Sequence, residues 1–152
     1  MIERMKVASL SLAASTLVSI AISEGFKSEA YIPVKGDVAT IGFGSTENVK
    51  LGDKITVERA LIKLLNDASK YEGAVKRCAN VPMYPYEYSA YVSLTYNIGE
   101  NAFCNSTLVK KLKQYDYEGA CKEILKWNKF KGNVLPGLDK RRKEEYNVCI
   151  GS

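Results

Sequence analysis

The stretch EGFKSEAYIPVKGDVATIGFGST, residues 24–46, decides how the rest of this chain is interpreted. Glu24 follows an apolar run, and the strand-like segment after it carries a second carboxylate, Asp37, and a hydroxyl, Thr40. Two carboxylates facing one cleft suffice to break a glycosidic bond. A protonated one donates a proton to the leaving oxygen, while an ionised one positions a water or stabilises developing positive charge. Glu24, Asp37 and Thr40 are therefore the candidate catalytic residues.

Length and composition indicate one soluble globular domain. The 152 residues are 46% apolar and 26% charged, enough for a sizeable core. A net charge of +5 favours approach to an anionic surface. The densest basic run, residues 139–143, comes without any nucleic-acid motif, so we expect a solvated helix face and no nucleic-acid partner. The chain lacks histidine and any CxxC motif, so we expect no metal site and no cofactor.

The N-terminal segment allows three interpretations. An uncharged run, VASLSLAASTLVSIAIS, extends from Val7 to Ser23 behind the charged head MIERMK. It is shorter and richer in Ser and Thr than a typical transmembrane helix. It has the layout of a signal peptide, but Ile20-Ala21-Ile22 is a poor cleavage site. A cleaved signal, an ordinary buried helix and a weak membrane segment that can leave the bilayer therefore stay open.

The pattern of the remaining chain predicts an α+β fold with its strands clustered early. Residues 31–34 and 38–43 are extended in character, with a turn signal at 35–37 between them. A long amphipathic helix is expected from Thr56 to about Cys78. Gly42 and Gly44 are expected to leave backbone close to the surface, which suits the floor of a groove. Further helices are expected over residues 86–98, 106–114, 117–127 and 138–149.

Several motifs occur in the order found in one known family. EGFKSEAY and TIGFG open the series, and AYVSL with YNIG, AFC with STL, and a tryptophan before PGL and RR follow it. Together they span about residues 24–149, and four motifs in sequence are far more specific than one. The chain thus resembles the phage-type lysozymes, and in particular the lambdoid phage endolysins of the signal-anchor-release kind.

The resemblance implies a lysozyme-like α+β fold. A small N-terminal β-hairpin lobe and a larger helical lobe would be joined by a long helix, with the active-site cleft between them. It implies a glycoside hydrolase that cleaves the β-1,4 bond between N-acetylmuramic acid and N-acetylglucosamine in peptidoglycan, with Glu24 as general acid. Thr40 would hold the attacking water jointly with a carboxylate on the opposite face of the sugar, which implies inversion.

The second carboxylate is where this chain departs from the family. The family's Asp usually lies nine residues after the Glu, and Pro33 stands there in this sequence. Asp37 is the nearest carboxylate on the intervening segment, and we assign it the role. A turn residue after Gly36 is its plain alternative. Glu29 is a third candidate.

The resemblance also implies a topology. Residues 1–23 would form the signal-anchor-release segment and residues 24–152 the catalytic domain. The protein would be exported, tethered to the inner membrane through residues 7–23, and then released to the periplasm. There it would act on the peptidoglycan glycan strand as a monomer and lyse the host.

The four cysteines are expected to form two disulfides in that oxidising compartment. Of the three possible connectivities, Cys78–Cys104 with Cys121–Cys149 joins partners that are close in sequence and closes the smaller loops.

Two alternative functions stay open. A lytic transglycosylase uses one Glu on the same substrate but leaves an anhydro sugar, and it has no need of Asp37 or Thr40. A non-catalytic module that binds wall or membrane is favoured only by Pro33.

Overall fold

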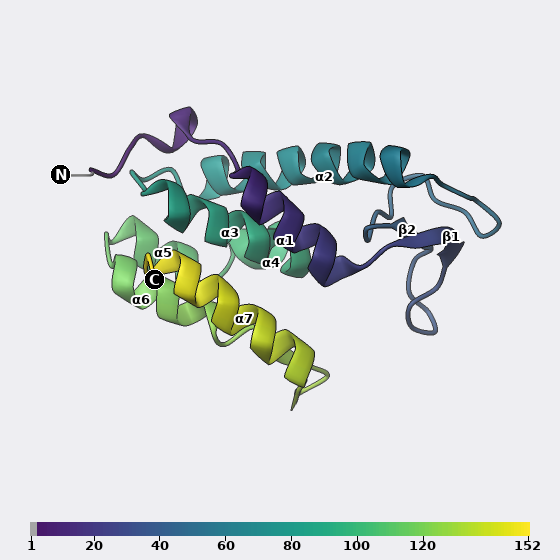
Figure 1. The fold of residues 1–152 in the computed structure, drawn as a ribbon. Helices are drawn as coiled ribbons and strands as arrows, with labels where there is room; N and C mark the ends of the chain where they lie inside the picture. Colours follow the sequence, from purple (N-terminus) through teal and green to yellow (C-terminus); the bar gives the residue numbers. More distant parts are fainter. Residues whose placement is uncertain (1–2) are drawn as a thin grey trace. The chain divides into compact units, whose positions relative to one another are not determined.

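The computed structural model describes residues 3–152 and divides them into two compact units. The hairpin unit is Leu17–Ser69, and the helical unit combines the described residues up to Thr16 with Lys70–Ser152. Two helices contribute to both units, α1 (Ala14–Glu24) and α2 (Val57–Cys78). Both can be followed in Figure 1. Helices dominate and the strands are few and short, as expected of this α+β chain.

The hairpin unit is built on β1 (Lys27–Tyr31) and β2 (Thr40–Gly42), which pair antiparallel with Lys27 opposite Gly42 and Tyr31 opposite Thr40. On its other side β1 forms a bridge between Glu29 and Lys54, so the segment before α2 acts as a third edge. The α2 helix begins where predicted, because the Thr56 hydroxyl accepts a hydrogen bond from the Arg59 amide at 3.3 Å.

The strand boundaries differ from those predicted. The first strand lies earlier than residues 31–34, and residues 32–39 form a loop between β1 and β2. Pro33 has no amide hydrogen to donate to a ladder. The Asp37 amide donates to the Val34 carbonyl at 2.9 Å, which closes a turn where strand pairing was expected.

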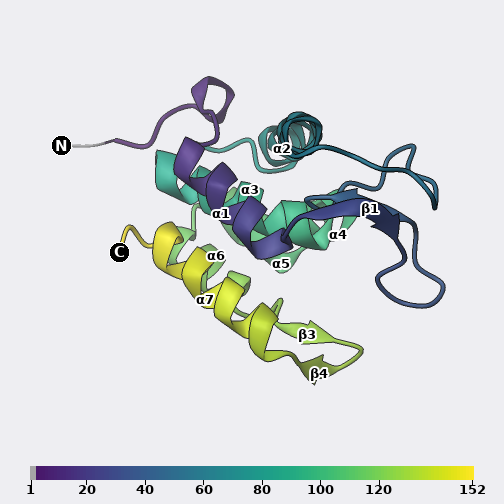
Figure 2. The same ribbon diagram turned by 45° about the vertical axis from the view of Figure 1, so that its right-hand side comes forward.

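The helical unit contains the remaining helices and a second small sheet. The bounds are η1 Val7–Ser9, α3 Pro85–Ile98, α4 Glu100–Cys104, α5 Thr107–Lys113, α6 Tyr117–Ile124, β3 Lys129–Phe130, β4 Asn133–Val134 and α7 Pro136–Cys149. The central α3 lies against α4 and α7, and α5 against α6. Figure 2 shows β3 and β4 as a short hairpin that leads into α7. Ser106 and Asp116 cap the N-termini of α5 and α6, since their side chains accept hydrogen bonds from the Val109 and Gly119 amides.

The core of the helical unit is centred on α3. Tyr88, Tyr91 and Leu94 are completely buried, so the aromatic side chains on this face of α3 belong to the core. Both predicted disulfides are confirmed, Cys78–Cys104 with Cα atoms 5.3 Å apart and Cys121–Cys149 with 5.8 Å. The Tyr91 hydroxyl lies 3.8 Å from the Cys121 sulfur and 3.4 Å from that of Cys149.

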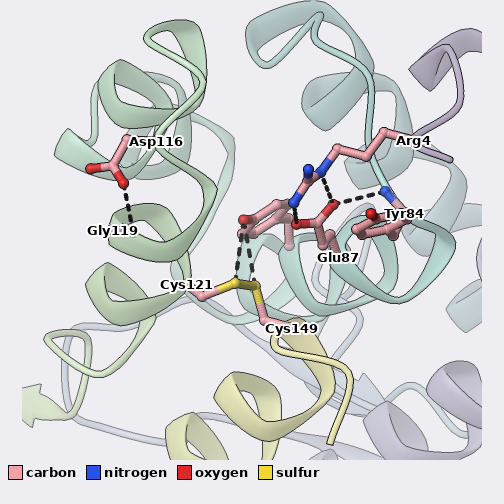
Figure 3. The surroundings of a disulfide bond; sticks show 8 residues. Arg4, Tyr84, Glu87, Asp116, Gly119, Cys121 and Cys149 are labelled. Atoms are coloured by element: carbon pink, nitrogen blue, oxygen red, sulfur yellow. Dashed lines mark hydrogen bonds and ion pairs between the residues drawn. A yellow bond between two sulfur atoms is a disulfide. The ribbon is translucent and has the colours of Figure 1, made fainter.

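The described residues before α1 pack on the helical unit. Val7 and Leu10 are buried in its core, and Met5 pairs with Met83 in an isolated bridge. Arg4 donates two hydrogen bonds of 3.0 Å to the carboxylate of Glu87, which Figure 3 shows beside the Cys121–Cys149 disulfide. None of the helices in residues 3–152 combines the length and apolar character required to cross a membrane. Residues 1 and 2 of the expected N-terminal segment lie outside the described part.

Candidate active site

Glu24 is the last residue of α1 and lies in the part of this helix that belongs to the hairpin unit. The helix stops after it because Gly25 adopts a positive φ of 71°, while the Gly25 amide still donates to the Ala21 carbonyl at 3.0 Å. The next residues turn directly into β1. Glu24 is half-buried, so its carboxylate lies at a boundary between protein and solvent.

A tight loop brings backbone against that carboxylate. Ile41 and Ser45 exchange two backbone hydrogen bonds of 2.9 and 3.0 Å, which close a loop of residues 41–45 with Gly42-Phe43-Gly44 between the two paired residues. Gly44 has φ of 89°, and a Cβ built at this position would lie 2.9 Å from Oε2 of Glu24. Only glycine therefore suits position 44, because it meets both the backbone conformation and the close approach of the carboxylate.

Thr40 immediately precedes this loop. It is the first residue of β2, opposite Tyr31 of β1, and its side chain is buried at 7% exposure. The Thr40 hydroxyl donates to the Val38 carbonyl at 3.2 Å. The sequence-predicted Glu24 and Thr40 thus belong to the same unit. The carboxylate of Glu24 contacts the loop that begins one residue after Thr40.

Asp37 lies in the loop between the two strands and is exposed. Its carboxylate accepts a hydrogen bond from the amide of the next residue, Val38, at 2.8 Å. This bond is of the kind that Asp makes in turns. The same unit therefore holds all three candidate residues, with Asp37 on a more open segment than the other two. Glu29, the third carboxylate candidate, forms an exposed pair with Lys54 at 3.7 Å.

Two contacts that support the loop were not predicted. The Ser45 hydroxyl donates to Oδ2 of Asp67 at 2.7 Å, which ties the end of the loop to α2. A Cβ at Gly42 would lie 3.0 Å from the Cβ of Ala60, so this glycine allows β2 to pack directly on α2. The prediction that both glycines bring backbone to a groove floor is wrong for Gly42, which is buried against the helix. The motif GFGST, residues 42–46, indicates a tight loop. Its contacts on α2, Ala60 and Asp67, lie about 20 residues further along the chain and cannot be found from the motif.

Comparisons with known proteins agree with this arrangement. A family model described as phage lysozyme matches residues 21–145, which include Glu24, Asp37 and Thr40. The chain is 41% identical to an endolysin of Acyrthosiphon pisum secondary endosymbiont phage 1 over 133 residues, covering 85% of this chain and 90% of the relative. It is 32% identical to the SAR-endolysin of Pseudomonas phage phiKMV over 141 residues, covering 90% and 87%.

The fold is also found among solved structures. The muramidase domain of SpmX from Asticaccaulis excentricus superposes with a TM-score of 0.85. That match has 25% identity and covers 93% of this chain and 98% of the other. The expected lysozyme-like α+β fold is confirmed. From its motifs, its fold and the family model together, the chain belongs to the phage lysozyme family.

Proposed function

We propose that this protein is a phage endolysin that hydrolyses the β-1,4 bond between N-acetylmuramic acid and N-acetylglucosamine in peptidoglycan, with inversion. Its family and its endolysin relatives support this activity. The structural observation that carries the proposal is the contact between the Glu24 carboxylate and Gly44, in the loop that follows Thr40. The loop brings backbone close to an acidic side chain, and the buried Thr40 lies four residues before Gly44 in the chain.

The roles follow from the chemistry of the bond. Glu24 donates a proton to the leaving glycosidic oxygen. Asp37 and Thr40 hold a water on the opposite face of the sugar, and Asp37 accepts its proton as the water attacks the anomeric carbon. A water on the opposite face requires a carboxylate separation of roughly 6.5–9.5 Å, and this spacing is what the proposed roles of Glu24 and Asp37 call for.

Digestion of purified peptidoglycan tests the proposal. We expect wild type to release fragments with reducing N-acetylmuramic acid ends, identified by mass, and Glu24→Gln to release none because it cannot protonate the leaving oxygen. Asp37→Asn should lose activity by a factor of about 100 or more, the usual effect of removing a general base. Anhydro ends would identify a lytic transglycosylase, and no product from wild type would indicate a non-catalytic binding module. Full activity of Asp37→Asn would remove Asp37 from the mechanism.

We also propose that residues 7–23 tether the protein to the inner membrane before it is released to the periplasm. The uncharged run and the SAR-endolysin relative from phage phiKMV support this topology. Val7, Leu10 and Ile20 are buried in the described structure. On release, each of these side chains would leave a lipid environment and pack against other apolar side chains of the protein. Glu24 directly follows this segment, and its setting in the hairpin unit would then depend on release.

A further inference from the structure

A cavity of about 560 Å³ in the hairpin unit lies among residues that the proposed reaction does not use. Ile41, Val49 and Ile55 contribute to its apolar wall, and Ile62 of α2 stands beside them. Such a cavity is large enough for a small polar headgroup.

Three cations line the same cavity, Lys54, Arg59 and Lys63. Arg59 and Lys63 are one turn apart on α2, where like charges repel and destabilise a helix. In the part of the chain that the structure describes, neither has an ion-pair partner. Among residues 3–152, the ammonium group of Lys54 has one ion pair, with Glu29, and both side chains are exposed, at 78% and 68%. A bound anion would relieve the repulsion that these three side chains create.

The single acidic side chain in the lining does not neutralise them. Oδ2 of Asp53 accepts a hydrogen bond from the Lys50 amide at 2.9 Å, and the Asp53 amide returns one to the Lys50 carbonyl at 3.1 Å. These bonds use Asp53 to close the turn of residues 50–53. The cavity therefore keeps a net positive charge.

Large apolar side chains are exposed at the edge of this basic cavity. Leu51, on the turn closed by Asp53, is 63% exposed, and Ile62 in the lining is 59% exposed. Apolar side chains next to basic ones are typical of surfaces that lie on an anionic bilayer, where the cations meet phosphate and the apolar groups enter the interface.

We propose that this cavity binds the phosphate of an anionic phospholipid headgroup, with Lys54, Arg59 and Lys63 around the phosphate and Leu51 and Ile62 against the glycerol and upper acyl region. The site would give the hairpin unit a membrane contact of its own, separate from residues 7–23. The acidic stem peptide of peptidoglycan would satisfy the cations but leave Leu51 and Ile62 in water, so the lipid fits the cavity better.

Binding to vesicles tests the site with the full chain. Co-sedimentation is measured with pure phosphatidylcholine and with phosphatidylcholine mixed with phosphatidylglycerol. The difference between the two isolates the headgroup effect from any binding through residues 7–23. We expect the anionic lipid to tighten binding, and Arg59→Glu with Lys63→Glu to remove about tenfold or more of that gain. The neutral double variant, Arg59→Gln with Lys63→Gln, should lose part of the gain in binding, although it adds no negative charge that could repel the lipid.

The matched control is Lys110→Glu with Lys113→Glu, which changes the net charge equally at two exposed lysines of α5. This control should keep most of the gain in binding that the anionic headgroup gives. Circular dichroism checks that all variants have the same helicity as wild type. An equal loss in the control would show unspecific attraction and overturn the site. Saturation by inorganic phosphate without any vesicle effect would show a free-anion site. Slower digestion of lipid-free peptidoglycan by Arg59→Glu with Lys63→Glu would reassign the cavity to the stem peptide. Either result would overturn the lipid proposal.

Discussion

Gly44 controls the approach of the loop after β2 to the carboxylate of Glu24. A Cβ at position 44 would force the Glu24 carboxylate to shift, and the positive φ of Gly44 already disfavours other residues. The glycine matters for catalysis because the Glu24 carboxylate beside it must be within hydrogen-bond reach of the leaving oxygen.

Gly44→Ala is therefore expected to reduce peptidoglycan hydrolysis by about a hundredfold, because the new methyl group displaces the Glu24 carboxylate by roughly 1 Å. The matched control for Gly44→Ala is Gly132→Ala, in the turn between β3 and β4. Gly132 also has a positive φ, of 81°, but a Cβ there meets nothing within 4 Å. Both variants should lose about 1 kcal/mol of unfolding free energy from backbone strain. Equal activity of the two variants would mean that the contact with Glu24 has no role in the reaction.

At the scale of single residues, the sequence indicates some parts of the candidate site and not others, for physical reasons. Glu24 and Thr40 lie in one continuous motif, so their neighbours in sequence are enough to single them out. The hydrogen bond from Ser45 to Asp67 joins residues 22 positions apart, and nothing in either segment alone specifies it. Asp37 stays a prediction, because its bond to the Val38 amide is the one that a turn residue makes in any case.

At the scale of elements, α7 is held to the helical unit by a buried ion pair. Arg142 is fully buried, and its Nε lies 2.6 Å from Oε1 of Glu145, which is also buried. Nη1 of Arg142 donates to Oδ1 of Asn97 at 2.8 Å and to the Trp127 carbonyl at 3.3 Å. Burial raises the pKa of Glu145, while Arg142 opposes that shift. The pair thus joins α7 to the end of α3 and to the segment after α6.

Arg142→Met should lower the unfolding free energy by about 3–5 kcal/mol at neutral pH, because it leaves a buried carboxylate without its nearest cation. The pKa of Glu145 would rise further. A raised pKa in the folded state means that stability is full below the unfolded value near 4.5 and is lost as pH rises through the folded value. The deficit of the variant should therefore shrink at acid pH, as measured by urea unfolding across the pH range.

Lys140→Met on the same helix is the control, since Lys140 pairs with Glu144 at 3.9 Å with both side chains exposed. Such a pair contributes about 0–1 kcal/mol, and its loss should show little dependence on pH. A deficit for Arg142→Met that does not change with pH would argue that lost packing, and not the Glu145 charge, causes it.

The helices α2, α3, α5 and α7 were predicted within two residues at each end, while α4 and the β3–β4 hairpin were not predicted. The helix predicted to begin at Thr56 is α2, and its spacing of Ala60, Leu64 and Ala68 gives three completely buried positions. The α4 helix and the β3–β4 hairpin are too short to show a periodic pattern. A Gly-Asn pair at residues 132–133 was a turn signal that could have indicated the hairpin.

At the scale of the whole molecule, the described N-terminal residues are part of the helical unit and not an appendage. Oε1 of Glu72 accepts hydrogen bonds from the Leu12 amide at 2.8 Å and from the Tyr88 hydroxyl at 2.7 Å. The guanidinium of Arg4 lies 4.3 Å from the Tyr84 ring and 3.6 Å from the Tyr117 ring, measured to their centroids. The contacts made by Arg4 and Leu12 cannot form while the segment that follows Arg4 is held in a bilayer, so they favour the released state in the proposed topology.

Arg4→Gln is expected to shift the protein toward the membrane fraction of fractionated cells. The change leaves the carboxylate of Glu87, whose side chain is 3% exposed, without its cation. We expect a loss of about 2 kcal/mol from the docked state, close to a thirtyfold change in the equilibrium. Lys6→Gln is the matched control, because it removes the same charge from the same segment at an exposed side chain. If both variants fractionate alike, net charge at the N-terminus, and not the contact with Glu87, sets the distribution. If the membrane-bound fraction hydrolyses peptidoglycan as fast per molecule as the released one, the setting of Glu24 does not depend on release.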